Sequence, residues 1–243
     1  MTYAIRFIFI LLLLPTMSEA QQTVTFSSTD GLMVTADLYL KDKSYPFIIL
    51  FHQANFSRGE YQETAPKLMK LGYNCLAVDL RSGKEVNFIK NETAARAHEK
   101  HLPTEYLDAE KDMQAAIEYV KQYNQNRIVL FGSSYSASLA LKIACDNKKV
   151  RAVIAFSPGE YFRPQLTLKT VLSKFDKPIF VASTKSENPF VKEMLSDVSG
   201  NLITWFVPSH NPGIHGSRAL WQSAPESNEC WFSLLLFFKG LKK

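Results

Sequence analysis

Short apolar runs alternate along the chain with longer amphipathic segments, and this alternation predicts a sheet covered by helices. Residues 23–28 and 32–40 flank Thr29-Asp30-Gly31, a turn sequence typical of a β-hairpin. Residues 47–51, Phe-Ile-Ile-Leu-Phe, have no polar face, as expected of a central parallel strand. Five further strands are predicted on the same grounds at residues 75–78, 128–131, 150–156, 178–182 and 202–207.

The segments between these strands carry helical patterns. Helices are predicted over residues 60–71 and 104–123, directly after residue 134, and over much of the tail at 217–241. A hairpin followed by alternating strands and helices predicts the α/β class, with a mostly parallel eight-stranded sheet, an N-terminal antiparallel hairpin and helices on both faces. Residues 84–103 are polar and lack a clean period, so we expect a surface excursion there that could serve as a cap.

The first 20 residues have the pattern of a secretory signal peptide. A basic start ending at Arg6 precedes an apolar run over residues 7–14, and Ser18-Glu19-Ala20 resembles a cleavage site. The apolar run is short for a membrane span, although an uncleaved anchor is the alternative. We therefore expect a signal peptide at 1–20, a single α/β domain at 21–243, a secreted or periplasmic location and no stable membrane anchor after cleavage.

Composition narrows the choice of partners. The 243 residues are 46% hydrophobic and 21% charged, which is ordinary for a globular domain. The formal net charge of +5 is scattered rather than clustered, so we expect no nucleic-acid partner. The wide separation of Cys75, Cys145 and Cys230 argues against a metal or redox motif, and the simplest interpretation is small buried hydrophobes, with one disulfide as the alternative.

A serine lies where one buried strand changes abruptly into a helix. The stretch Gly132-Ser133-Ser134-Tyr135-Ser136 approximates the G-x-S-x-G nucleophile elbow, with serine in place of the second glycine. In an open parallel sheet this junction lies at the carboxyl end of the strands, where ligands bind. Ser134 is therefore the candidate nucleophile; the alternative is that Ser133 or Ser134 only caps the helix.

A serine nucleophile needs a base and an acid that orients the base. The α/β-hydrolase order of Ser, acid and His directs the search downstream, where His215 precedes Gly216 and the last predicted helix, and His210 is the competing histidine. For the acid, Glu187 follows the strand at 178–182. Glu160 is the alternative acid, and Asp197 remains open.

An oxyanion hole needs two backbone N–H donors. Tyr135, directly after the candidate nucleophile, supplies one. The loop after residues 47–51 supplies the other, with Ala54 preferred and Gln53 second. His52 in that loop is expected to be structural rather than the base.

These segments together resemble the α/β-hydrolase superfamily, specifically its dienelactone-hydrolase-like and small carboxylesterase branch. The resemblance runs in order through FIILFHQANFSRGEY, GYNCLAVDLRSG, VLFGSSYSASLAL, KPIFVASTKSE and IHGSRALW. It implies the α/β-hydrolase fold and a triad of Ser134, Glu187 and His215. Ser136 in place of glycine and Glu187 in place of the usual aspartate are the two departures. Dienelactone hydrolases often use cysteine as the nucleophile, whereas Ser134 indicates oxygen-ester chemistry.

The expected activity is that of a serine hydrolase acting on small or medium esters through an acyl-enzyme. It requires no metal and no organic cofactor, and its partner is a small-molecule ester. Residues 84–103, with His98, His101 and Tyr106 at their edge, are expected to influence substrate choice, and a long-chain lipase is disfavoured because the segment is short. The alternatives are a non-catalytic binding protein of the same fold, or an acyltransferase or peptidase using the same triad. The sequence does not indicate the oligomeric state.

Overall fold

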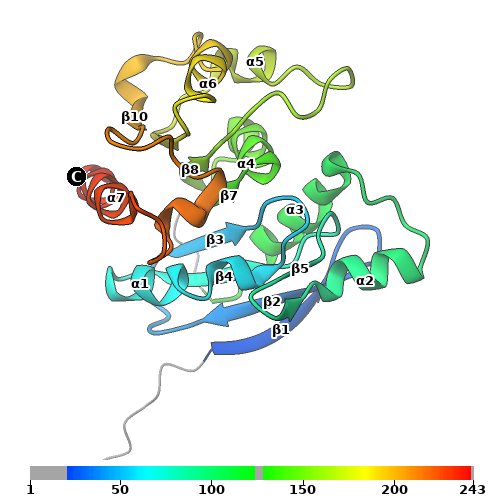
Figure 1. Cartoon of the computed structure of the whole chain (residues 1–243). Helices are drawn as coiled ribbons and strands as arrows, with labels where there is room; N and C mark the ends of the chain where they lie inside the picture. Colours follow the sequence, from blue (N-terminus) through cyan, green and yellow to red (C-terminus); the bar gives the residue numbers. More distant parts are fainter. Residues whose placement is uncertain (1–20, 124–127, 242–243) are drawn as a thin grey trace, which may run out of the picture.

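The structure, a computed structural model, describes residues 21–123 and 128–241. Its main sheet contains β1 (Gln21–Ser27), β2 (Met33–Tyr39), β3 (Phe47–Phe51), β4 (Asn74–Val78), β7 (Ile128–Ser133), β8 (Val150–Phe156), β9 (Ile179–Ala182) and β10 (Ile203–Phe206). The strand order is β1-β2-β4-β3-β7-β8-β9-β10 (Figure 1). Only β2 runs antiparallel to its neighbours, and all other adjacent pairs are parallel. The predicted α/β class, the hairpin and the mostly parallel sheet are confirmed.

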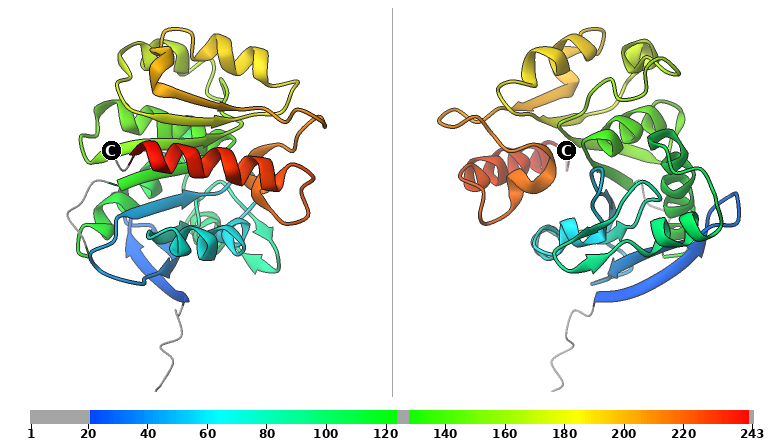
Figure 2. Two further views of the ribbon diagram at one scale, coloured as in Figure 1. Left: turned by 90° about the vertical axis from the view of Figure 1, so that its left-hand side faces the viewer. Right: turned by 45° about the vertical axis from the view of Figure 1, so that its right-hand side comes forward.

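Helices cover both faces of this sheet (Figure 2). One face carries α3 (Glu110–Val120), α4 (Tyr135–Asp146), α5 (Leu168–Val171) and α6 (Asn188–Met194), and the other carries α1 (Thr64–Lys70) and α7 (Ser227–Leu241). Successive residues of a strand point to opposite faces. Within β3, Ile49 therefore packs in the core under α3 and α4, whereas Ile48 and Leu50 pack in the core under α1 and α7.

The three cysteines fit this packing. Cys75 and Cys230 are buried, Cys145 is partly buried, and all three are free thiols. The interpretation as small hydrophobes is therefore correct for Cys75 and Cys230, which lie within the core under α1 and α7.

The segment 84–103 has more structure than its sequence suggested. It contains a short hairpin of β5 (Glu85–Val86) and β6 (Ile89–Lys90), followed by α2 (Glu92–Glu99), which Asn91 caps through the Ala94 N–H. The residues of α2 that are buried are small, namely Thr93, Ala94 and Ala97. A short helix that buries only small side chains produces a weak hydrophobic period, so the sequence gives no clear helical signal for α2.

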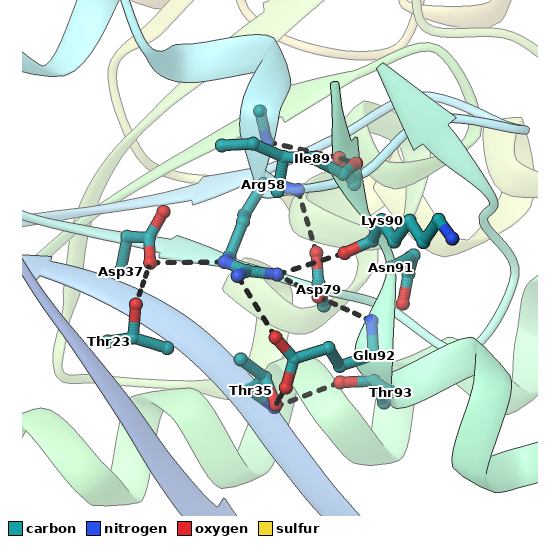
Figure 3. A network of polar contacts seen from close by, with 12 residues as sticks. Thr23, Thr35, Asp37, Arg58, Asp79, Ile89, Lys90, Asn91, Glu92 and Thr93 are labelled. Carbon is teal, nitrogen blue, oxygen red and sulfur yellow. Dashed lines mark hydrogen bonds and ion pairs between the residues drawn. The ribbon is translucent and has the colours of Figure 1, made fainter. Parts of the chain in front are cut away.

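One buried arginine ties this segment to the sheet (Figure 3). Arg58 lies in the 3-10 turn Arg58–Tyr61 and contacts Asp37 of β2 at 3.0 Å and Asp79, directly after β4, at 2.7 Å. Its remaining guanidinium nitrogen reaches Glu92 in α2 at 3.2 Å. Asp79 also accepts the backbone N–H groups of Arg58 and Glu92. The cluster therefore fixes the start of α2 against the hairpin side of the sheet.

Two other sequence expectations concern the ends of the chain. Residues 1–20, the predicted signal peptide, lie outside the described residues. The tail predicted as largely helical contains a 3-10 turn at Gly216–Leu220 and then α7, with residues 221–226 between them. Within the residues that the structure describes, no helix has the length and apolar character needed to cross a bilayer.

Candidate active site

Ser134 lies at the tip of the turn between β7 and α4. Its backbone angles, φ 61° and ψ −125°, fall in a region that non-glycine residues rarely occupy. The Ser134 N–H is held by the Phe156 carbonyl of β8 at 2.8 Å, and the residue is 6% exposed. A helix cap normally has extended backbone and accepts a bond from the helix, whereas the Ser134 side chain accepts none there. Ser134 is therefore not an ordinary cap, and its position on a sharp strand-to-helix turn is the one that the sequence predicts for a nucleophile elbow.

The residues around the elbow explain its unusual sequence. A Cβ on Gly132 would lie 2.4 Å from the backbone of Ala137, so the strand and helix can approach this closely only with glycine there. At the position of the missing second glycine, the Ser136 hydroxyl accepts the Ser133 N–H at 2.9 Å and donates to the Phe51 carbonyl of β3 at 2.7 Å. Ser136 therefore connects the turn at Ser133 to the neighbouring strand β3 by hydrogen bonds.

His215 and Glu187 meet at the same edge of the sheet. The Nδ1 atom of His215 lies 2.5 Å from Glu187 Oε1. Glu187 follows β9, and His215 ends the loop that follows β10, so both lie beyond the carboxyl ends of parallel strands, as Ser134 does. Because a carboxylate only accepts, Nδ1 carries the proton and the lone pair of Nε2 is left available.

Glu187 is itself held by several donors. Its Oε2 atom accepts the Ser157 hydroxyl at 2.7 Å and the Thr184 N–H at 3.0 Å. Burial acts to raise the pKa of Glu187, but the hydrogen bonds from His215, Ser157 and Thr184 outweigh it and lower this pKa to about 2. The carboxylate therefore stays ionised throughout the range in which a histidine base operates.

The alternative acids and the alternative histidine lie elsewhere. Glu160 accepts the N–H groups of Leu168 and Lys169, and so caps the start of α5. Asp197 and His210 are exposed. Among the carboxylates considered, Glu187 is the one that contacts His215.

The two backbone N–H groups expected from the sequence to serve as oxyanion donors have no protein acceptor within the described residues. They belong to Tyr135, the first residue of α4, and to Ala54 in the loop after β3. The competing donor, the Gln53 N–H, is bonded to Glu60 Oε2 at 2.8 Å and is therefore occupied. The geometry thus favours Ala54 over Gln53 as the second oxyanion donor.

His52, the other residue of that loop, is fully buried and committed to the fold. Its Nε2 atom accepts the Leu80 N–H at 2.9 Å, so Nδ1 carries the proton and donates to the Gln53 carbonyl at 2.7 Å. Burial lowers the pKa of His52 to about 4. The ring is therefore neutral, has no free nitrogen and is unsuited to serve as the base.

Ser134 and His215 are not in hydrogen-bond contact in this structure. No hydrogen bond between Ser134 and His215 is present within the described residues. The hydroxyl of Tyr161 donates to the Ser157 carbonyl at 2.9 Å. Catalytic hydrogen bonds are often long or misaligned before substrate binds.

A small hollow lies beside the loop that follows β3. It has a volume of about 180 Å³ and is lined by Ala54, Ser82, His98 and Tyr106 among others, so the edge of the excursion lies beside Ala54, whereas Ser134, Glu187 and His215 do not line this hollow. The ring of Tyr106 stacks on that of Tyr135 at 4.4 Å. A larger hollow of about 820 Å³ between β1, α3 and α4 contains none of the candidate site residues. The described residues hold no cluster of His, Cys, Asp and Glu suited to a metal.

Sequence reasoning missed two residues that support the site. Ser157, with φ 50°, bridges Glu187 and the backbone N–H of Gly216, which adjoins His215. Glu60 accepts hydrogen bonds from the Gln53 N–H, in the loop after β3, and from the Ser217 hydroxyl. The position of Ser157 directly after the buried strand β8 was the available sequence signal for it. The roles of both residues depend on partners far away in the sequence.

The acid–base pair leads to a prediction about stability and pH. The folded-state pKa of Glu187, about 2, lies below the ordinary value of 4.5, so its ionised form adds stability above about pH 4.5 that is lost as the pH falls toward 2. The Glu187→Gln variant lacks this titration. We expect urea denaturation to show a wild-type advantage that shrinks between about pH 5 and pH 2. An advantage independent of pH would contradict this assignment.

Comparison with known proteins agrees with this architecture. The model of the dienelactone hydrolase family matches residues 34–208. A search of the curated proteins finds no match. An esterase of Pyrococcus furiosus superposes with a TM-score of 0.65 at 17% identity, covering 93% of this chain and 92% of the esterase. For a dienelactone hydrolase of Anabaena variabilis the values are 0.64 and 16%, covering 90% and 95%.

A third solved structure is similar over a smaller share of its own length. It is a 2,6-dihydroxy-pseudo-oxynicotine hydrolase, with a TM-score of 0.69 at 16% identity, and the match covers 93% of this chain and 70% of that one. At these identities the superpositions establish a shared α/β-hydrolase fold, whereas the family model spans most of the sequence. The chain is thus a member of the dienelactone hydrolase family.

Proposed function

We propose that the protein is a serine hydrolase that cleaves small or medium carboxylic esters through an acyl-enzyme. The observation that carries the proposal is the hydrogen bond of His215 to Glu187 at the same sheet edge as the strained Ser134. Membership of a hydrolase family supports the reaction class.

In the proposed mechanism, the residues of the site act in the following order. His215 Nε2 takes the proton of the Ser134 hydroxyl, whose oxygen then attacks the ester carbonyl. The N–H groups of Ala54 and Tyr135 stabilise the oxyanion of the tetrahedral intermediate. Glu187 orients His215 and stabilises its charged form, which protonates the departing alcohol. Water, activated by His215, then releases the acid from Ser134.

Two subsidiary proposals concern export and substrate selection. Residues 1–20 direct export and are removed, which leaves a mature chain that begins near Gln21 in a secreted or periplasmic location. Residues 84–103 take part in substrate selection, supported by His98 and Tyr106 lining the small hollow.

Hydrolysis of p-nitrophenyl acetate, butyrate and octanoate by the purified mature chain tests the proposal, with Ser134→Ala as the control. We expect turnover of the acetate and butyrate, weaker turnover of the octanoate, and none above background in the control. Folded wild-type protein that hydrolyses none of these esters would contradict the proposal and favour a binding function.

A further inference from the structure

Glu60 is a fully buried carboxylate in the 3-10 turn Arg58–Tyr61. The turn follows residues 52–57, which carry the proposed donor Ala54 and are referred to as the oxyanion loop. Burial raises its pKa, and the hydrogen bonds from Ser217 and Gln53 act in the opposite direction. Burying a carboxylate costs free energy of folding unless hydrogen-bond donors pair with its oxygens. The identity of those donors is therefore informative.

The first oxygen of Glu60 acts on the loop that carries Ala54. Oε2 accepts the Gln53 N–H at 2.8 Å. The Gln53 carbonyl is also occupied, by the Phe56 N–H at 3.3 Å and by His52 Nδ1 at 2.7 Å. With the backbone N–H and carbonyl of Gln53 both occupied, the peptide between Gln53 and Ala54 is held in one orientation, and the Ala54 N–H has no acceptor within the described residues.

The second oxygen of Glu60 binds the segment that carries His215, residues 207–217, which is referred to as the histidine loop. Oε1 accepts the Ser217 hydroxyl at 2.6 Å, and the Ser217 N–H donates to the hydroxyl of Ser133, next to the candidate nucleophile, at 2.9 Å. The two loops touch directly at Gly216, where an added Cβ would lie 2.2 Å from Gln53 Oε1. One carboxylate thus connects the oxyanion loop, the histidine loop and the segment before Ser134.

We propose that Glu60 is a positioning residue that sets the oxyanion loop and the histidine loop in register around Ser134. The inference rests on the proposed esterase function and deepens it, because Glu60 acts through Gln53 and Ser217 without touching substrate. Its removal loosens the alignment of the Ala54 N–H with the developing oxyanion, which weakens binding of the transition state more than binding of the ester.

The test compares Glu60→Ala and Glu60→Gln with Glu63→Gln. Glu63 is the matched control because it accepts the backbone N–H of Gln222 at 2.8 Å from an exposed position and contacts neither loop. We expect Glu60→Ala to lower kcat for p-nitrophenyl acetate by about 10²-fold while KM changes by less than about threefold. Inhibition by phenylboronic acid, which forms a tetrahedral adduct, should weaken in proportion to kcat. Glu60→Gln keeps one acceptor for the Gln53 N–H and should recover part of the loss.

Ser217→Ala keeps the experiment decisive if Glu60→Ala does not fold. It removes only the histidine-loop half of the bridge, and we expect it to lower kcat in the same sense without a matching rise in KM. The positioning role is overturned if wild type is active but the Glu60 and Ser217 variants keep the kcat and boronic acid affinity of Glu63→Gln. Wild type that hydrolyses no ester would instead refute the proposed function itself.

Discussion

Replacing His215 by alanine is expected to lower kcat/KM for short esters by about 10⁴- to 10⁶-fold, because Ser134 then has no base. His215 is the histidine that contacts Glu187, and its bonding leaves Nε2 free to accept a proton. Loss of the ring also removes the acid that protonates the departing alcohol. Steady-state kinetics on p-nitrophenyl acetate measure the effect.

His210→Ala is the matched control for this substitution. His210 lies in the same loop after β10 but is exposed. We expect its removal to leave kcat/KM unchanged within error. Comparable losses in the two histidine variants would show that the loop as a whole, rather than the His215 ring, is required.

Replacing Arg58 by methionine is expected to lower the free energy of unfolding by about 3–5 kcal/mol at neutral pH. The substitution keeps much of the side-chain volume but leaves Asp37 and Asp79 without their buried cation. The Asp37 and Asp79 side chains are 1% and 0% exposed, so water cannot solvate the two carboxylate charges that lose Arg58. Arg151→Met, an exposed position on β8, should change the free energy of unfolding by less than about 0.5 kcal/mol.

The Arg58 effect should depend on pH. Burial raises the pKa of Asp79 to about 6 even though Arg58 opposes the shift, and removing Arg58 raises this pKa further. A folded-state pKa above the ordinary value of 3.8 means that the unfavourable charged form appears as the pH rises. Urea denaturation should therefore show a larger loss at about pH 8 than at about pH 5. Equal losses at both pH values would contradict the role assigned to the buried charges.

The sheet could be predicted because its signals are local. Each central strand, such as β3 or β8, is a short apolar run that needs no distant partner to be recognised. The segment 84–103 could not be predicted because its order depends on Arg58, which clamps Glu92 and Asp79 across the fold. A polar segment held by contacts with a buried arginine and a buried carboxylate has little hydrophobic periodicity to detect.

The candidate site divides in the same way. Ser134 and His215 follow from motif and chain order, whereas the choice between Glu187 and Glu160 depends on which carboxylate reaches the histidine. Likewise, sequence offers both Gln53 and Ala54 as oxyanion donors. Glu60 distinguishes them by occupying the Gln53 N–H. Contacts between segments that are distant in sequence decide these assignments.

The most direct test of the account is labelling of the mature protein with a fluorophosphonate, followed by mass spectrometry to locate the adduct. Such probes react with a serine that has been activated by a base and an oxyanion hole. The account predicts a single adduct on Ser134 in wild type and none in Ser134→Ala. Folded wild type that takes up no label, or an adduct that persists in Ser134→Ala, would contradict the claim that Ser134 is an activated nucleophile.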